Sequence, residues 1–246
     1  MMPTYFNRTS ALGAMLLAIA CAPASSNKQG AESTTVARTD TAAVAAAAAV
    51  AAVAAVAAPQ DSNVIRADRA RIQGSPTAPV WVIEVSDFQC PYCQEWHDAT
   101  YPAFRDEFVK TGKVRMAYVN FPLAQHQRAW PTAEAAMCAG AQGKFWEMHD
   151  AVFATQARWE SMPAPETLFD SLAKSTGVDV ARWRDCIKAG TMKPLIQADH
   201  DRAAAAGITS TPSFMIGNQI LSGAQPIEEL RRAIDSAMVT SRKPAP

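Results

Sequence analysis

The most constraining feature of this sequence is a pair of cysteines, Cys90 and Cys93, that follows closely on an apolar run. Residues 80–85 are almost continuously apolar and largely β-branched, which is typical of a central strand covered on both faces of its sheet. Pro91, between the two cysteines, suits the first turn of a helix. We therefore predict a buried strand, a short loop and a helix that begins at the C-P-Y-C tetrapeptide.

The remaining sequence extends this unit into an α/β pattern. The first helix is predicted to reach about Lys110, with an interruption near Tyr101–Pro102, and a second strand is predicted over 114–120. Helical spacing, separated by Gly or Pro, follows in the segments 129–141, 145–155, 165–176, 180–189 and 194–206. The predicted final elements are a hairpin with strands 213–216 and 219–221, and a helix over 227–238.

Three segments make up the chain in this prediction. Residues 1–21 have the pattern of an export signal, with a positive start, a short apolar run and small residues before Cys21. Residues 22–63 form an Ala-, Ser- and Thr-rich spacer with little material for a core. Residues 64–241 are long enough for one domain with a sizeable buried centre, and the helical block spans about 124–206.

Two features of the N-terminal part leave alternatives open. A small residue followed by Cys21 resembles the lipidation signal of bacterial lipoproteins, although Ala18 stands where that signal usually has Leu. Lipidation of Cys21 and an ordinary cleaved signal with an incidental cysteine are the two interpretations. Residues 42–58 contain only Ala and Val, so we expect a low-complexity spacer there. A membrane anchor is the minority alternative, because Ala is only weakly apolar.

Composition excludes several functions. The formal net charge is zero and no cluster of Lys and Arg is present, which argues against a nucleic-acid partner. The sequence has neither a P-loop nor a dinucleotide-binding fingerprint, and we expect no cofactor. Zinc at the C-x-x-C pair would need further cysteines or closely spaced histidines. Because His97, His126, His149 and His200 are scattered along the chain, we predict no metal site.

An odd count of five cysteines in an exported chain requires an explanation. Lipidation of Cys21 would leave four cysteines, for which three pairings exist. Cys90 and Cys93 are separated by only two residues and form one unit, which leaves Cys138 and Cys186 as the other two.

The C-P-Y-C tetrapeptide is suited to thiol–disulfide chemistry. At a helix N-terminus, free N–H groups and the helix dipole favour a negative charge, so we expect a low pKa and a thiolate at Cys90. Cys93, one turn further, is better placed to resolve a mixed disulfide. Glu84 is the only charged residue of the preceding strand, and a carboxyl buried there could exchange a proton with Cys93. The alternative places Glu84 at a strand edge in water.

Several stretches, taken together and in this order, resemble the DsbA-like branch of the thioredoxin superfamily. They are 87–93, 207–214, 216–218 and 223–226, and 143–150 resembles the helical insert of that family. The similarity covers about residues 70–240. The resemblance implies an α/β, thioredoxin-like fold with an inserted α-helical domain.

The resemblance also implies roles for individual residues. Cys90 would be the exposed nucleophile, Cys93 its resolving partner and Glu84 the buried acid of the family. Pro212 would follow a cis peptide bond and face the C-P-Y-C motif, where it keeps metal ions off the thiols. Thr211 would offer its backbone to an incoming peptide. Without the resemblance, an ordinary trans bond is expected, because only about 5–6% of X–Pro bonds are cis.

Cys138 and Cys186 match positions that form a second disulfide in some members of the family, and free buried thiols are the alternative. The redox dipeptide Pro91–Tyr92 departs from the best-known oxidants of the family, which carry a His between the cysteines. Tyr92 has no positive charge to stabilise a thiolate. The direction of electron flow therefore stays open at this point.

The implied function is that of an exported enzyme, a protein thiol–disulfide oxidoreductase that forms disulfides in secreted proteins. A reductase or isomerase of the same fold is the alternative. Isomerases commonly dimerise through an N-terminal domain, and residues 22–63 lack the apolar content to build one, which favours a monomer and an oxidant. A thiol-based copper-handling lipoprotein is a third hypothesis, since thiolates suit Cu(I), but no Met- or His-rich tract supports it.

The expected partners are exported proteins that contain thiols or disulfides, and a membrane or periplasmic redox partner. The expected location is the periplasm or another extracytoplasmic site, with a lipid anchor at the membrane if Cys21 is lipidated.

Overall fold

The structure is a computed structural model, and it describes residues 61–241. The expected export signal and spacer, including Cys21 and the Ala/Val run 42–58, lie outside the described residues. Within the part that the structure describes, no helix has the length and apolar character needed to span a bilayer.

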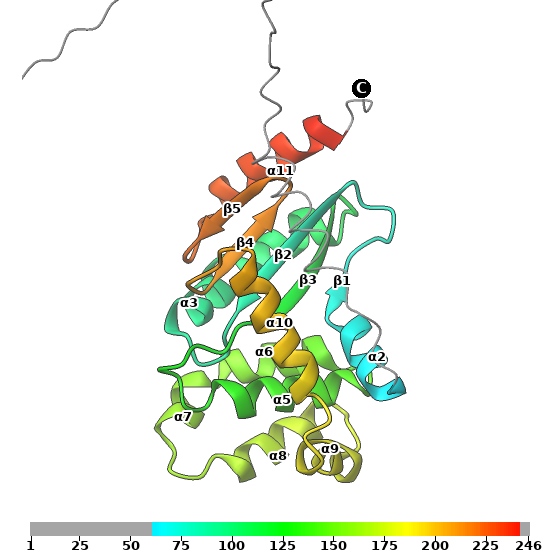
Figure 1. The fold of residues 1–246 in the computed structure, drawn as a ribbon, viewed down its shortest axis with the longest axis vertical. Helices are drawn as coiled ribbons and strands as arrows, with labels where there is room; N and C mark the ends of the chain where they lie inside the picture. The colour runs from blue at the N-terminus through cyan, green and yellow to red at the C-terminus, as the bar shows by residue number, and fades with distance from the viewer. Residues whose placement is uncertain (1–60, 242–246) are drawn as a thin grey trace, which may run out of the picture. The chain divides into compact units, whose positions relative to one another are not determined.

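A five-stranded mixed sheet, ordered β1-β3-β2-β4-β5, forms the centre of the described part (Figure 1). β2 (Val80–Ser86) lies in the middle and pairs in parallel with β3 (Val114–Asn120). On its other side β2 pairs antiparallel with β4 (Ser213–Ile216), which forms a hairpin with β5 (Gln219–Ser222). β1 (Ile72–Gln73) pairs antiparallel with the far side of β3. β2 is buried along almost its whole length, as its apolar run predicted.

Different helices cover the two faces of the sheet, because side chains alternate between faces along each strand. One face packs against α3 (Pro91–Ala99), α4 (Tyr101–Phe104) and α11 (Ile227–Ser241) through a cluster that includes Val82, Met116, Trp96 and Leu230. The other face, with Ile83 and Met215, packs against Ala203 of α10 (Lys193–Ala205). In Figure 1, α10 crosses in front of the sheet.

The helix after the C-P-Y-C motif is divided, as its proline predicted. α3 ends at Ala99, α4 follows, and the π-helical segment η1 (Arg105–Val109) completes the run. Pro102 lies in the first turn of α4, where a missing N–H group leaves no hydrogen bond unmade.

The helical insertion lies between β3 and β4. Its helices are α5 (Ala129–Gly140), α6 (Phe145–Ala154), α7 (Gln156–Ser161), α8 (Glu166–Ser175), α9 (Val180–Lys188) and α10. A disulfide between Cys138 and Cys186, with Cα atoms 5.9 Å apart, joins α5 to α9. The core of the insertion continues without a break to Phe88, Tyr118, Cys90 and Cys93, so the insertion and the sheet share one buried cluster.

Two elements at the start of the described part were not predicted, α2 (Ser62–Ala70) and β1. α2 buries only Val64 and Ala67, which is too sparse a pattern to predict a helix. The segment is held by Arg71, whose buried guanidinium pairs with Asp199 of α10. The same carboxylate accepts hydrogen bonds from the backbone and side-chain N–H groups of Asn120, at 3.2 and 2.9 Å.

Candidate active site

The two central cysteines lie where the C-terminal end of β2 leads into α3. Cys90 is the N-cap residue of α3 and has an extended backbone (φ −72°, ψ 123°), and Pro91 follows in the first turn. The N–H groups of Cys93 and Gln94 donate to the carbonyl oxygen of Cys90, at 3.1 and 3.2 Å. Both cysteines are free thiols, so the structure describes the reduced dithiol.

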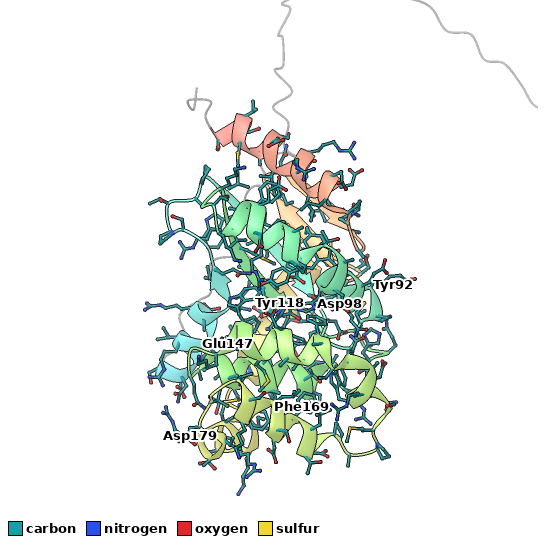
Figure 2. The ribbon with its side chains drawn as sticks, turned by 180° about the vertical axis from the view of Figure 1, so that it is seen from behind. Tyr92, Asp98, Tyr118, Glu147, Phe169 and Asp179 are labelled. Carbon is teal, nitrogen blue, oxygen red and sulfur yellow. A yellow bond between two sulfur atoms is a disulfide. The ribbon has the colours of Figure 1, made fainter. Side chains whose placement is uncertain are left out.

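Cys90 is less exposed than the resemblance implied. The residue is only 3% exposed, and Cys93 is fully buried. Thr211 contributes to the cover over Cys90, because its backbone carbonyl oxygen lies 3.4 Å from the Cys90 Sγ atom. Tyr92, by contrast, is 62% exposed and projects at the margin of the molecule (Figure 2).

The environments of the two thiols shift their pKa values in opposite directions. A hydrogen bond from the Cys93 thiol, helped by Thr211 and by the N–H groups of the first turn, lowers the pKa of Cys90 to about 6 although burial opposes the shift. Burial raises the pKa of Cys93 well above its ordinary value, and the interaction with Cys90 adds to this. At neutral pH the pair therefore consists of a thiolate at Cys90 and a thiol at Cys93.

Glu84 lies inside the sheet and not at an edge in water. It is fully buried in β2, in register with Tyr118 of β3 and Phe214 of β4. Neither of its carboxylate oxygens has a hydrogen-bond partner among the described residues, and burial raises its pKa to about 8. The hydroxyl of Ser86, on the same face of β2, lowers the pKa values of both Glu84 and Cys93, although it forms no hydrogen bond with a described residue.

The Thr211–Pro212 peptide bond is cis and lies beside Cys90. It is brought there by the sheet, because β4 begins at Ser213 and pairs through that residue with Val85, near the end of β2. The carbonyl oxygen of Pro212 accepts a hydrogen bond of 2.7 Å from the N–H group of Gly223. Because Gly223 directly follows β5, this bond links the loop that contains Pro212 to the end of the hairpin.

Asp87, which the sequence analysis did not assign a role, fixes the loop between β2 and α3. Its carboxylate accepts hydrogen bonds from the N–H groups of Gln89 and Leu123, at 2.8 and 2.9 Å, and lies 2.7 Å from Nδ1 of His126. The sequence does contain a signal for Asp87, because a charged residue directly after a buried strand often has a specific role.

Gln156 of α7 holds the same loop from the side of the insertion. Its Nε2 group donates to the carbonyl oxygens of Phe88 and Cys90, at 2.7 and 3.1 Å. No sequence signal marks this residue, because its position depends on how the insertion packs against α3.

One group in the described residues has the composition and spacing to hold a metal ion. Ligand atoms of His97, His149 and Asp150 all lie within 4.8 Å of one another. His97 lies on α3, one helical turn after Cys93, and neither thiol belongs to the group.

Comparison with known proteins decides the family. A sequence profile described as Thioredoxin matches residues 66–236. The chain belongs to the thioredoxin family. Within this family the fold is DsbA-like, with the helical insertion between β3 and β4. Crystal structures of oxidised BdbD from Bacillus subtilis and of alpha-DsbA1 from Wolbachia pipientis superpose with TM-scores of 0.63 and 0.61, at 22% and 23% identity. They cover 69% and 70% of this chain and 92% of each solved chain.

Relatives of this thioredoxin-family chain include antiporters and disulfide bond formation proteins. A Na⁺/H⁺ antiporter, NhaA 3 of Salinispora tropica, is 35% identical over 71% of the chain, but the chain spans only 26% of that protein. A probable disulfide bond formation protein D of Bacillus anthracis is 27% identical over 67% of the chain and 76% of the relative. The chain thus spans about a quarter of the antiporter relatives and about three quarters of the disulfide bond formation relatives.

Proposed function

We propose that this chain is an enzyme, a protein thiol–disulfide oxidoreductase whose reacting atoms are the sulfurs of Cys90 and Cys93. The observation that carries the proposal is the placement of two free thiols at the first turn of α3, one beside the carbonyl oxygen of Thr211 and the other buried. Similarity to proteins named disulfide bond formation protein D supports it.

The oxidising half-reaction starts from the Cys90–Cys93 disulfide. A substrate thiolate attacks Cys90 Sγ, a substrate–Cys90 disulfide forms, and the Cys90–Cys93 bond breaks with its electron pair on Cys93. A second substrate thiolate then attacks the substrate sulfur of the mixed disulfide and releases the Cys90 thiolate. Two electrons pass from the substrate dithiol to the protein, and the substrate gains one disulfide. The low pKa of Cys90 makes it the better leaving group in the second step.

In this cycle Glu84 exchanges a proton with Cys93. Cys93 leaves as a thiolate and has a raised pKa, so it takes up a proton. Glu84, with a pKa raised to about 8, carries a proton at neutral pH and shares Ser86 as a neighbour with Cys93. The carboxyl therefore supplies the proton when the disulfide opens and receives one when it closes.

The proposed direction is oxidation of thiols in exported proteins. A stabilised Cys90 thiolate favours the reduced form of the couple, which makes its disulfide a better oxidant. The proposed substrates pair an extended segment with the backbone of Thr211 beside Cys90. We place the enzyme outside the cytoplasm, as a monomer, with a separate redox partner that reoxidises it and with lipidation of Cys21 as its means of anchoring.

One observation favours the reverse direction as a second candidate. The side chain of Tyr92, the residue before Cys93, is exposed and uncharged, so it offers the thiolate no positive charge. A reductase or isomerase of the same fold would have a lower reduction potential.

The reduction potential of the Cys90–Cys93 couple, measured by equilibration with glutathione buffers, tests the proposal. Oxidation predicts a potential clearly above that of glutaredoxins, together with oxidative refolding of a reduced test protein. A potential in the thioredoxin range, with rapid reduction of insulin, would establish the reductase instead. Tight stoichiometric Cu(I) binding without turnover would remove the enzyme proposal altogether.

Substitution identifies the nucleophile. Cys90→Ser should abolish exchange, whereas Cys93→Ser should accumulate mixed disulfides with substrates, because the resolving thiol is missing. Mixed disulfides in the Cys90→Ser protein would mean that the roles are reversed.

A further inference from the structure

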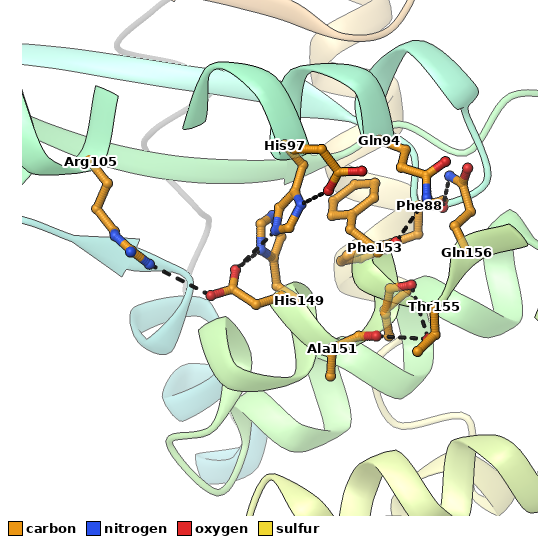
Figure 3. Close-up of polar contacts among 12 residues, drawn as sticks. Phe88, Gln94, His97, Arg105, His149, Ala151, Phe153, Thr155 and Gln156 are labelled. Carbon is orange, nitrogen blue, oxygen red and sulfur yellow. Dashed lines mark hydrogen bonds and ion pairs between the residues drawn. The ribbon is translucent and has the colours of Figure 1, made fainter. Parts of the chain in front are cut away.

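Two histidines that are far apart in the sequence meet beside α3. The rings of His97 on α3 and His149 on α6 have centroids 5.3 Å apart (Figure 3). The Oδ1 atom of Asp150 lies 2.8 Å from Nδ1 of His149 and 3.4 Å from Nε2 of His97. These three residues are called the His–Asp–His cluster below.

We propose that the His–Asp–His cluster is a binding site for a divalent metal ion, and that the ion is Zn²⁺. Two imidazoles and one carboxylate are donors that zinc accepts in sites with an open fourth position. On a tetrahedral zinc with bonds of about 2.1 Å, neighbouring donor atoms are about 3.4 Å apart. The separations of 2.8 and 3.4 Å in the cluster therefore require only small side-chain movements to enclose the ion.

The orientation of His97 supports this assignment. Its Nδ1 atom lies 2.9 Å from the carboxylate of Asp98, which accepts but does not donate hydrogen bonds when ionised. In the tautomer that donates its Nδ1 proton to Asp98, the lone pair of Nε2 points at the cluster and is available to a metal ion. A carboxylate that orients a metal-binding imidazole through its other nitrogen is the usual second partner in such sites.

His149 is held in place by packing. It is fully buried, and its ring stands nearly perpendicular to the rings of Tyr118 and Phe153. Its Nε2 atom has no hydrogen-bond partner among the described residues, so only Nδ1 is engaged, and it faces Asp150. The side chain of Asp150 is 41% exposed, which gives an ion a route to the cluster and lets a water complete its coordination.

Arg105 is the cation that competes for this site. Its NH1 group lies 3.7 Å from Oδ2 of Asp150, the carboxylate oxygen that does not face the histidines (Figure 3). Removing the positive charge of Arg105 should strengthen the binding of a metal ion. If the cluster only joined two helices by hydrogen bonds, removing this charge would not create or strengthen metal binding. A bound ion would tie the helix that starts at Cys90 to the insertion, through His97 and His149.

Calorimetric titration with Zn²⁺ tests the proposal. The protein is first oxidised so that Cys90 and Cys93 are closed in a disulfide and cannot bind the metal. We expect one Zn²⁺ per chain. His97→Gln and Asp150→Asn should each weaken binding by more than about tenfold, and Asp98→Asn by about tenfold through loss of the orienting carboxylate. Arg105→Gln should tighten it, and His200→Gln, a histidine outside the cluster, should leave it unchanged.

Cobalt provides a second measurement. Bound Co²⁺ should give visible absorption bands of four-coordinate metal without the near-ultraviolet charge-transfer band of a thiolate ligand. The proposal is overturned if Zn²⁺ binding is absent or non-stoichiometric, or if it survives His97→Gln and Asp150→Asn unchanged. Asp98 is exposed, so we expect Asp98→Asn to fold. If His97→Gln and Asp150→Asn do not fold, the zinc affinity of Asp98→Asn decides between the two outcomes.

Discussion

The Sγ atom of Cys90 lies 3.4 Å from the backbone carbonyl oxygen of Thr211, although the two residues are 121 positions apart in the sequence. This contact sets the chemistry of the site in two ways. It adds to the burial of Cys90, which is only 3% exposed, and it places the cysteine at the helix N-terminus in contact with a fixed polar group. A substrate that pairs with the Thr211 backbone therefore arrives next to the reacting sulfur.

The first prediction concerns the ionisation of Cys90. Alkylation by iodoacetamide should depend on pH with a midpoint near 6, because the pKa of this thiol is lowered to about 6. Cys93 should react only after unfolding. The control is the denatured protein, in which the midpoint should return to about 8.5, the ordinary value of a thiol. A midpoint near 8.5 in the folded protein would contradict the prediction.

The second prediction concerns the exposed residue between the cysteines. Tyr92→His should raise the reduction potential of the couple by about 30 mV or more, equivalent to about 1.4 kcal/mol, because an imidazolium stabilises the Cys90 thiolate and hence the reduced form. Equilibration with glutathione measures the shift. Tyr92→Phe is the matched control and should leave the potential unchanged. Equal potentials for the His and Phe variants would show that charge at this position has no influence.

The third prediction concerns the buried acid. Glu84 has a folded pKa of about 8 against an ordinary value of 4.5, so the folded state holds a proton that the unfolded state has lost between these pH values. Its contribution to stability is fully present below pH 4.5 and is lost as pH rises to about 8. Above pH 8 the loss is on the order of 5 kcal/mol, at 1.36 kcal/mol per pKa unit.

Glu84→Gln should therefore flatten the dependence of unfolding free energy on pH and stabilise the protein most in alkaline buffer. Urea unfolding of both proteins at pH 6.5 and 8.5 measures the difference. This window avoids His149, whose pKa is lowered to about 4 and whose contribution therefore changes at lower pH. Parallel pH profiles for the two proteins would refute a buried, protonated Glu84.

The fourth prediction concerns the disulfide of the insertion. Cys138 and Cys186 are separated by 48 residues, and closing a loop of this length stabilises a protein by about 4 kcal/mol in the chain-entropy model. Replacing both cysteines by Ala should lower the free energy of unfolding by up to that amount. Guanidinium unfolding measures it, and the potential of the Cys90–Cys93 couple should not change. Mass mapping under non-reducing conditions should find the Cys138–Cys186 peptide pair in the parent protein.

Much of the fold could be predicted from the sequence because its signals are local. The strand over 114–120 was predicted with the bounds of β3, since a mainly apolar stretch between Gly112 and Pro122 has few alternatives. Five of the six helices of the insertion were placed within one residue because Gly and Pro separate them, whereas α7 was not predicted. α2 and β1 were missed because they bury few residues and depend on Arg71 and Asp199, which meet only in the folded chain.

The residues of the candidate site likewise divide into those with local sequence signals and those brought together only by folding. Cys90, Cys93 and Glu84 were identified because they lie within one strand and the helix turn that follows it. The exposure of Cys90 was misjudged, since residues far away in the sequence, such as Thr211, contribute to its burial. His97 and His149 were dismissed as scattered, and only the packing of α6 on α3 brings their rings to 5.3 Å. The distance between the two histidines depends on how the insertion packs, and the spacing of residues along the sequence does not reveal it.

The pairing of β2 with β4 across the whole insertion has a consequence for how the chain folds. The connection between β2 and β3 is shorter than that between β2 and β4, and the helices of the insertion pack mainly against helices that are close in the sequence. These parts can therefore form early. β4 must close a far longer loop before it reaches β2, which costs entropy and makes it a late step. Until β4 pairs with β2, a folding chain therefore lacks the contact between Cys90 and Thr211, so the reactive sulfur gains its final environment only when the sheet is complete.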